Sequence, residues 1–369
     1  MITKEIQLPF FAKASLFFVG LFALISMLYI AQGIIVPFIF AIVMAIVLHP
    51  VVNIFVNRKI NRVIAIIITL VLTIIILGIF GAFIITQAMR FSETWPKMVA
   101  KFTELFNEAT NWASGYFDIS PQKISEWITK SKSEAINTSG TAIGQTLVNV
   151  GSSLVVLFII PVYIFMLLFY QPLLIEFIRR VFGDTNRSTV SQIVTEIKKV
   201  IQKYLTGLFL EVVIVSVLHS IGLLLLGVPY AILLGIIGAL LNLIPYLGGI
   251  VSVALPMMVA LATKSSPWVA LYVLIVYYII QLIDNNYIIP KIVASKVRIN
   301  ALVSIVVVLA FGALWGIPGM FISIPMTAII KVIFDHIEPL KPWGFVLGDT
   351  MPPLLKIKPL INKILKETR

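Results

Sequence analysis

The residues best suited to binding chemistry gather at one position in an otherwise apolar sequence. Asp284, Asn285, Asn286 and Tyr287 come directly after a 17-residue apolar segment, and Lys291 follows them. Carboxylate and amide oxygens suit a hard cation, a proton or a polyol. Aspartate and asparagine also favour turns, so the alternative is a solvated cap at the end of a helix. The residue types alone leave both interpretations open.

Two further ionisable residues lie inside an apolar run over residues 204–227. Glu211 and His219 are eight residues apart, which places them on roughly one side of a helix. If this run spans a membrane, a charge at its centre costs at least about 2.5 to 3.5 kcal/mol unless it faces a cavity or a partner. One interpretation is a proton relay. The other is that Glu211, two turns from the end of the run, bonds a neighbouring helix or reaches the interface.

Two other apolar runs, 228–263 and 301–330, are interrupted in their middle by proline and glycine. The interrupting and neighbouring residues are Asn242, Pro245, Tyr246, Gly248 and Gly249 in the first run, and Gly312, Trp315, Gly316, Pro318 and Gly319 in the second. Proline removes a backbone hydrogen bond and glycine weakens a helix, so each run is expected to form two half-helices joined by an irregular tip.

Irregular backbone at membrane depth is tolerated only where it is buried in protein or lines a cavity. We therefore expect two re-entrant hairpins, and paired broken segments of this kind point to a transporter's binding site near the midplane. The alternative is a loosely packed bundle with kinks.

Several classes of chemistry have no matching residues. The chain has no cysteine, and its three histidines lack the HExxH spacing of a zinc helix. A paired-aspartate GxGD pattern, a GxSG serine and a P-loop are also missing from the sequence. We expect no metal, no cofactor and no enzymatic activity, and any transport should be driven by a gradient.

Composition sets the fold class. Hydrophobic residues make up 60% of the 369 residues and charged residues only 12%, roughly half the charged share of a soluble domain. Uncharged runs over 14–48, 63–88, 147–170 and 228–263 reach the length of about 20 residues that a spanning helix needs. Continuous runs exclude the alternating pattern of a barrel, so the sequence predicts an all-α integral membrane protein.

Six plain spans are expected besides the two broken runs. They are 14–31, 34–48, 63–88, 147–170, 204–227 and 267–283, with the first retained as a span and paired with the second in a helical hairpin. The expected regions are 1–89 with three spans, an extracytoplasmic helical subdomain at 90–145, a fourth span and a cytoplasmic amphipathic helix at 146–203, a transport core at 204–335, and a basic cytoplasmic tail at 336–369.

The distribution of positive charge predicts the orientation. The net charge of +12 comes from Lys and Arg beside the spans, which is typical of orientation signals facing anionic lipid and makes nucleic acid an improbable partner. With both broken runs as hairpins, twenty Lys and Arg fall on one side, so both termini are expected in the cytoplasm. The hairpins then enter from opposite sides, as in an inverted repeat.

Four motifs in this chain resemble the autoinducer-2 exporter family of bacterial membrane transporters. They are Gly227-Val-Pro229-Tyr230, Leu243-Ile-Pro245-Tyr246-Leu-Gly248, Asp284-Asn285-Asn286-Tyr287-Ile-Ile-Pro290-Lys291 and Gly312-Ala-Leu-Trp315-Gly316-Ile-Pro318-Gly319. The resemblance implies a homo-oligomeric plasma-membrane exporter of small solutes. Some members are linked to the quorum-sensing furanone and others are proposed to exchange sodium for protons. This chain departs from the family at Gly249, where many relatives have proline, and at Glu211.

These observations predict a gradient-driven exporter of a small polar solute that works by alternating access. A sodium–proton antiporter of the same family and a non-transporting membrane scaffold are the alternatives. The residues expected along the solute or ion pathway are Asp284, Asn285, Asn286, Lys291, Glu211, His219, Asn242 and Tyr246.

Overall fold

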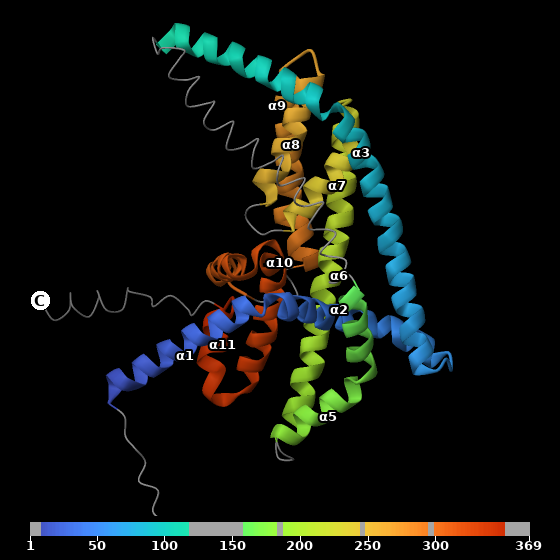
Figure 1. The fold of residues 1–369 in the computed structure, drawn as a ribbon, viewed down its shortest axis with the longest axis vertical. Coiled ribbons are helices and arrows are strands. Elements are labelled where there is room, and N and C mark those ends of the chain that lie inside the picture. The colour runs from blue at the N-terminus through green and yellow to red at the C-terminus, as the bar shows by residue number, and fades with distance from the viewer. Residues whose placement is uncertain (1–8, 118–157, 183–186, 244–247, 294–298, 351–369) are drawn as a thin grey trace, which may run out of the picture.

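The protein is a bundle of helices, as the sequence predicts. The computed structural model describes residues 9–117, 158–182, 187–243, 248–293 and 299–350 (Figure 1). Within these ranges the only extended pairing is an isolated bridge between Ile299 and Gly348. The all-α fold class is therefore confirmed.

Six helices in the described ranges are long and apolar enough to cross a membrane. They are α1 (Phe10–Ile30), α2 (Gln32–Asn57), the Arg62–Ser92 part of α3 (Arg62–Phe117), the Ser188–Leu225 part of α6 (Arg187–Leu225), the Trp268–Ile292 unit of α9 (Trp268–Ile283) with the π-helix η2 (Asp284–Val293), and α10 (Ala301–His336).

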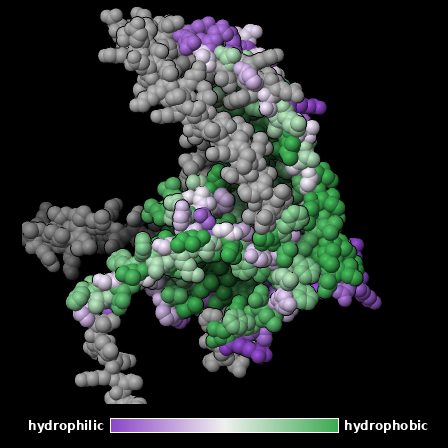
Figure 2. Space-filling view, in the orientation of Figure 1, coloured by the Kyte–Doolittle hydropathy of each residue, from purple (hydrophilic) through white to green (hydrophobic). Residues whose placement is uncertain are grey.

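Five of these six helices correspond to expected plain spans, and the sixth, α10, is the second broken run. The expected span at 147–170 is described only from Phe158 onward. Its helix, Phe158–Phe169, is bent by 63° from α5 (Gln171–Phe182). Hydrophobic side chains cover much of the visible surface, most continuously along α3 (Figure 2). Such a surface needs lipid around it.

The first two helices do not form the expected hairpin. Only Ala31 separates them, and its backbone N–H still bonds to the Met27 carbonyl at 2.9 Å. Reversal into an antiparallel pair takes a loop of two to five residues. In Figure 1, α2 accordingly continues onward from the end of α1, and no residue of α1 is buried.

Two helices run further than expected, and for α2 a tertiary contact provides the support. α2 continues through Pro50 to Asn57, and Gln202 of α6 donates to the Ile46 carbonyl at 2.8 Å. Proline at position 50 cannot bond that carbonyl four residues back, so the side-chain amide satisfies it. α3 runs unbroken to Phe117, past the expected boundary at 89/90; residues 118–145 of the expected subdomain lie outside the described ranges.

α6 corrects the expectation of a separate amphipathic helix on the cytoplasmic surface. The basic stretch and the fifth span form one helix of 39 residues, and no proline interrupts it. Val190 and Ile201, on the apolar stripe of the basic stretch, are buried in the protein. Figure 1 shows α6 along much of the molecule, with α7 (Ala231–Asn242), α8 (Gly248–Thr263) and α9 beside its second half.

Two of the hydrophobic clusters in the described ranges join several helices each. One joins α2, α3 and the Phe158–Phe169 helix around Ala41, Ala65, Ile66 and Ile164. The other joins α6 to α9 around Leu223, Leu234, Val259 and Val273. After α10, a 3₁₀ turn, η4 (Glu338–Leu340), leads to α11 (Lys341–Leu347), which packs back on α10 with Gly344 against Asp335.

Both broken runs fold back on themselves. α7 ends at Asn242, and a Cβ at Gly248, the first residue of α8, would collide with the Leu241 carbonyl. In α10, Gly316 has φ 63° and ψ −146°, and a Cβ at Gly319 would collide with the Phe311 carbonyl. Residues seven or eight apart in a straight helix are separated by more than 10 Å. Each run is therefore a pair of half-helices with a sharp reversal between them.

Candidate functional site

Asp284 is the only member of the 284–287 cluster that points into the protein. Its side chain is 1% exposed, at the point where α9 passes into η2. Asn285, Asn286 and Tyr287 are exposed. A π-helical segment inside a longer helix often marks a functional site. The turn-like composition at this position therefore does not make a solvated cap; the helix continues and buries the carboxylate.

The exposed neighbours of Asp284 bond locally. Asn285 accepts from Gln281 Nε2 at 3.2 Å, and Asn286 donates to the Leu282 carbonyl at 2.8 Å. The ammonium group of Lys291 lies 4.0 Å from the centre of the Tyr287 ring. The structure therefore does not gather Asn285, Asn286 and Lys291 around the buried carboxylate.

Asn242 connects Asp284 to the first broken run. Its Nδ2 donates to Asp284 Oδ2 at 2.7 Å, while Asp284 Oδ1 is buried without a hydrogen-bond partner. Asn242 is the last residue of α7, directly before the reversal. Pro245 and Tyr246, expected at this tip, lie outside the described ranges. The hydrogen bond holds one arm of the tip against the start of η2.

The other arm of this tip contacts Gln281, which was not predicted from the sequence. Gln281 lies over Gly249, whose added Cβ would come within 2.8 Å of Gln281 Oε1. Gln281 also donates to Asn285, as described above. A lone amide in the apolar 267–283 segment was the available signal. Polar side chains from α9 and η2 thus flank the first tip on both arms.

Glu211 lies on α6, which packs against η2. It is 4% exposed, and its carboxylate interacts electrostatically with that of Asp284. The neighbouring Tyr204, one to two turns before it on α6, is also buried and interacts with Glu211. The burial of Glu211 disagrees with the interpretation that it reaches the aqueous interface.

His219 belongs to a second polar cluster two turns further along α6. Its ring stacks on Tyr277 of α9, with ring centres 4.0 Å apart and planes inclined by 14°. His219 Nδ1 and the Tyr277 hydroxyl are both buried without hydrogen-bond partners. A Cβ at Gly238 would lie 3.1 Å from the former and 3.3 Å from the latter. Tyr277 was not predicted, although its spacing of seven residues from Asp284 places both on one helical face.

The second broken run carries no comparable polar group at its tip. Trp315 is buried and donates from Nε1 to the Leu28 carbonyl at 3.1 Å, at the junction of α1 and α2. Ile39, Ile322 and neighbouring apolar side chains surround it. Gly312 faces Met320 across the reversal, and Pro318 and Gly319 begin the returning half-helix.

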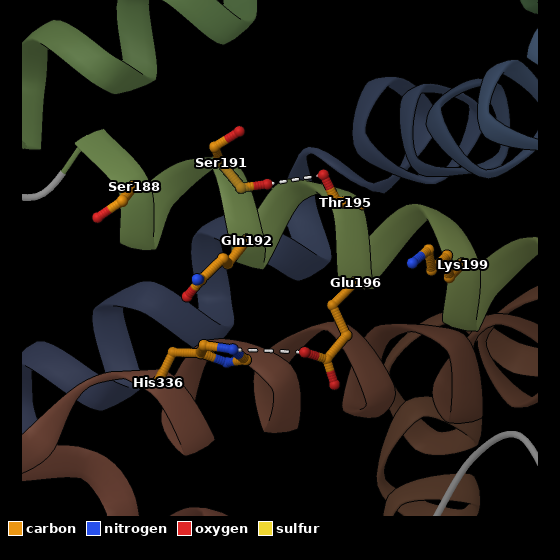
Figure 3. Close-up of a pocket in the computed structure, with 7 residues that line it drawn as sticks. All are labelled: Ser188, Ser191, Gln192, Thr195, Glu196, Lys199 and His336. Carbon is orange, nitrogen blue, oxygen red and sulfur yellow. Dashed lines mark hydrogen bonds and ion pairs between the residues drawn. The ribbon is translucent and has the colours of Figure 1, made fainter.

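A separate hollow of about 740 Å³ lies at the other end of α6 (Figure 3). His336, at the end of α10, contacts Glu196 of α6 there, with Nε2 3.3 Å from Oε2. The lining residues are Ser188, Ser191, Gln192, Thr195, Glu196, Lys199 and His336. None of them is buried. This hollow is a surface feature, unlike the buried cluster around Asp284.

The donor set around Asp284 can exchange protons and bind a small polar group, but it offers few metal ligands. Within the part of the chain that the structure describes, no three His, Asp or Glu side chains gather as they would around a metal ion. What the site brings together is two carboxylates and one amide, next to a break in a helix.

The comparisons with known proteins agree with this architecture. The model of the AI-2E family transporters matches residues 16–338. The chain is 26% identical over 281 residues to "Putative transport protein YueF" of Bacillus subtilis (strain 168), covering 71% of this chain and 76% of that protein.

Two further relatives match over shorter stretches. "Putative transport protein YrrI" of Bacillus subtilis is 32% identical over 36% of this chain and 37% of its own length. "Putative permease PerM" of Escherichia coli (strain K12) is 30% identical over 48% and 50%. The described helices make this a multi-pass membrane protein. With a family match over most of its length, the chain belongs to the AI-2E transporter family.

Proposed function

We propose that this protein exports a small polar solute, such as an autoinducer-2-like furanone, across the bacterial inner membrane. The observation that carries the proposal is the 2.7 Å hydrogen bond from Asn242 to the buried Asp284. It places an acidic and an amide group at the tip of a broken apolar segment. Half-helix ends and polar groups at such a break are the recurring design of transporter binding sites.

Transport would proceed by alternating access. The first broken segment, α7 with α8, opens the site to one side when Asn242 leaves Asp284 and Gly249 leaves Gln281. The second, α10, packs its tip on α1 and α2 and enters from the opposite side. Both termini are then cytoplasmic, and an ion gradient drives the cycle. The proposed assembly is a homo-oligomer, as the family resemblance implies.

A second candidate is exchange of sodium for protons. The observation that favours it is Glu211, a second buried carboxylate that interacts with Asp284. A neutral solute needs only one acid to hold an amide in place, whereas a pair of acids suits a charged cargo.

Flux through proteoliposomes tests the proposal. The full chain is reconstituted, and efflux of furanone, Na⁺ and H⁺ is measured separately for the native chain and for Asp284→Asn. We expect the substitution to reduce flux to background while the protein still inserts. The matched control is Asp335→Asn, the same change at a half-exposed residue paired with Lys331 on α10.

Native flux in Asp284→Asn would refute the assignment of the site. Equal loss in Asp335→Asn would show a general effect of removing an acid. If the native chain moves none of the three probes although it is folded and inserted, the scaffold interpretation takes the place of transport.

A further inference from the structure

We propose that Glu211 and Asp284 together hold one exchangeable proton inside the membrane domain. The inference rests on the proposed function, because it assigns the coupling ion of a gradient-driven carrier to two named side chains. Asp284 is 1% exposed and Glu211 is 4% exposed, and their carboxylates interact across the contact between η2 and α6. Water therefore does not screen them from each other.

The helices packed around the pair supply no positive charge to neutralise it. α7 and α8 carry no ionisable side chain, and the ionisable groups of α9 are tyrosines. On η2, Lys291 is exposed and lies over Tyr287. On α6, Lys203 is exposed and about 12 Å before Glu211 along the helix.

Within the described ranges, the charged groups of α10 already have partners. The ionisable residues of α10 are Lys331, Asp335 and His336, all in its last two turns. Lys331 pairs with Asp335, and His336 contacts Glu196. Tyr204 and His219 of α6 are the buried polar groups that flank Glu211 on its own helix.

Two buried carboxylates that repel each other are costly to ionise together, because the repulsion adds to the cost of removing each charge from water. Pairs of this kind share a proton. The hydrogen bonding leaves room for such a proton, because Asn242 donates to Asp284 Oδ2 and Oδ1 is buried without a partner. A proton at this position forms one O–H bond to a carboxylate oxygen and is taken from water; release returns it.

A proton suits the site better than a metal cation. Hard cations take six or more oxygen ligands at short distance. Here the amide presents its nitrogen to Asp284, and within the described ranges no third acid completes a cage. Because Asn242 ends α7, gain or loss of the proton at Asp284 changes the acceptor that holds the end of α7.

Infrared spectroscopy of the reconstituted full chain tests the inference. In sodium-free buffer at neutral pH, we expect a C=O stretching band of a protonated carboxylic acid that moves to lower frequency in D₂O. The double variant Glu211→Gln, Asp284→Asn should lack it. Glu338→Gln, which alters an acid that is 82% exposed, should keep it. Each single substitution in the pair should shift or remove the band, which keeps the test valid if the double variant does not fold.

The inference is overturned if the native chain shows no such band, if the band persists in the double variant, or if it is unchanged in both single variants. The measurement requires no transport. A band without flux of any probe contradicts the proposed export alone, and flux without a band contradicts the proton site alone.

Discussion

The two broken segments share a sequence pattern but are held in different ways. At the first tip, Asn242 bonds a buried carboxylate, and Gln281 lies over Gly249. At the second tip, Trp315 inserts into an apolar cluster, and the reversal depends on the backbone of Gly316. The first tip is thus anchored by polar contacts, one of them to a carboxylate, and the second by apolar packing.

This difference indicates a division of roles. A contact between polar groups can be exchanged for solute, water or a proton at small net cost, because new partners replace the old ones. Apolar packing with a glycine-only backbone has no such alternative. We therefore expect the first segment to move during transport and the second to brace the core against α1 and α2.

The comparison of the two tips requires that both segments are hairpins that enter from opposite sides. A labelling experiment tests this requirement, and its two possible outcomes differ most. The chain has no cysteine, so single thiols at Ser265, Lys291 or Glu338 give no background. With an impermeant maleimide, Lys291→Cys and Glu338→Cys should label from one side and Ser265→Cys from the other. Labelling of Lys291→Cys and Glu338→Cys from opposite sides would mean that α10 crosses the membrane as one span.

Removing the polar anchor should be the next largest effect. Asn242→Ala deletes a hydrogen bond to a carboxylate, worth about 1.5 to 3 kcal/mol, which corresponds to roughly a 10- to 100-fold loss of flux in proteoliposomes. Asn286→Ala is the matched control, because Asn286 is exposed and bonds only within its own helix. Equal flux in both variants would remove the functional distinction of the first tip.

The second tip should respond in stability. Gly316→Ala forces a side chain into a conformation that only glycine adopts readily, at about 1 to 3 kcal/mol, and should lower the thermal unfolding midpoint in detergent. Gly20→Ala lies in a regular helix with open space around it, and should raise that midpoint slightly. A midpoint unchanged by Gly316→Ala would mean that the reversal lies elsewhere.

Trp315→Phe should have the smallest effect. The substitution keeps an aromatic ring in the cluster and removes the Nε1 bond to the Leu28 carbonyl, at about 0.5 to 1.5 kcal/mol of stability. Flux per folded protein should be unchanged. A loss as large as that of Asn242→Ala would show that the second tip also takes part in transport.

The sequence was least informative where a short linker or a side chain from another helix decides the direction or the length of a helix. It did not reveal that Ala31 leaves α1 and α2 end to end, nor that Gln202 lets α2 pass Pro50. It placed Asn285, Asn286 and Lys291 with Asp284. In a helix, however, successive side chains are rotated by about 100° around the axis, so the neighbours of an inward-pointing Asp284 point elsewhere.

The sequence alone determined the all-α membrane class, most of the spans and the positions of both breaks. These follow from local physics, since uncharged runs need lipid and proline with glycine interrupts a helix wherever it lies. Only the tertiary structure decided that Asn242 bonds the buried Asp284, 42 residues away in the chain, and that the helix carrying Glu211 packs beside them. Which side chains meet depends on how α6, α7 and η2 pack together, and no local rule encodes that packing.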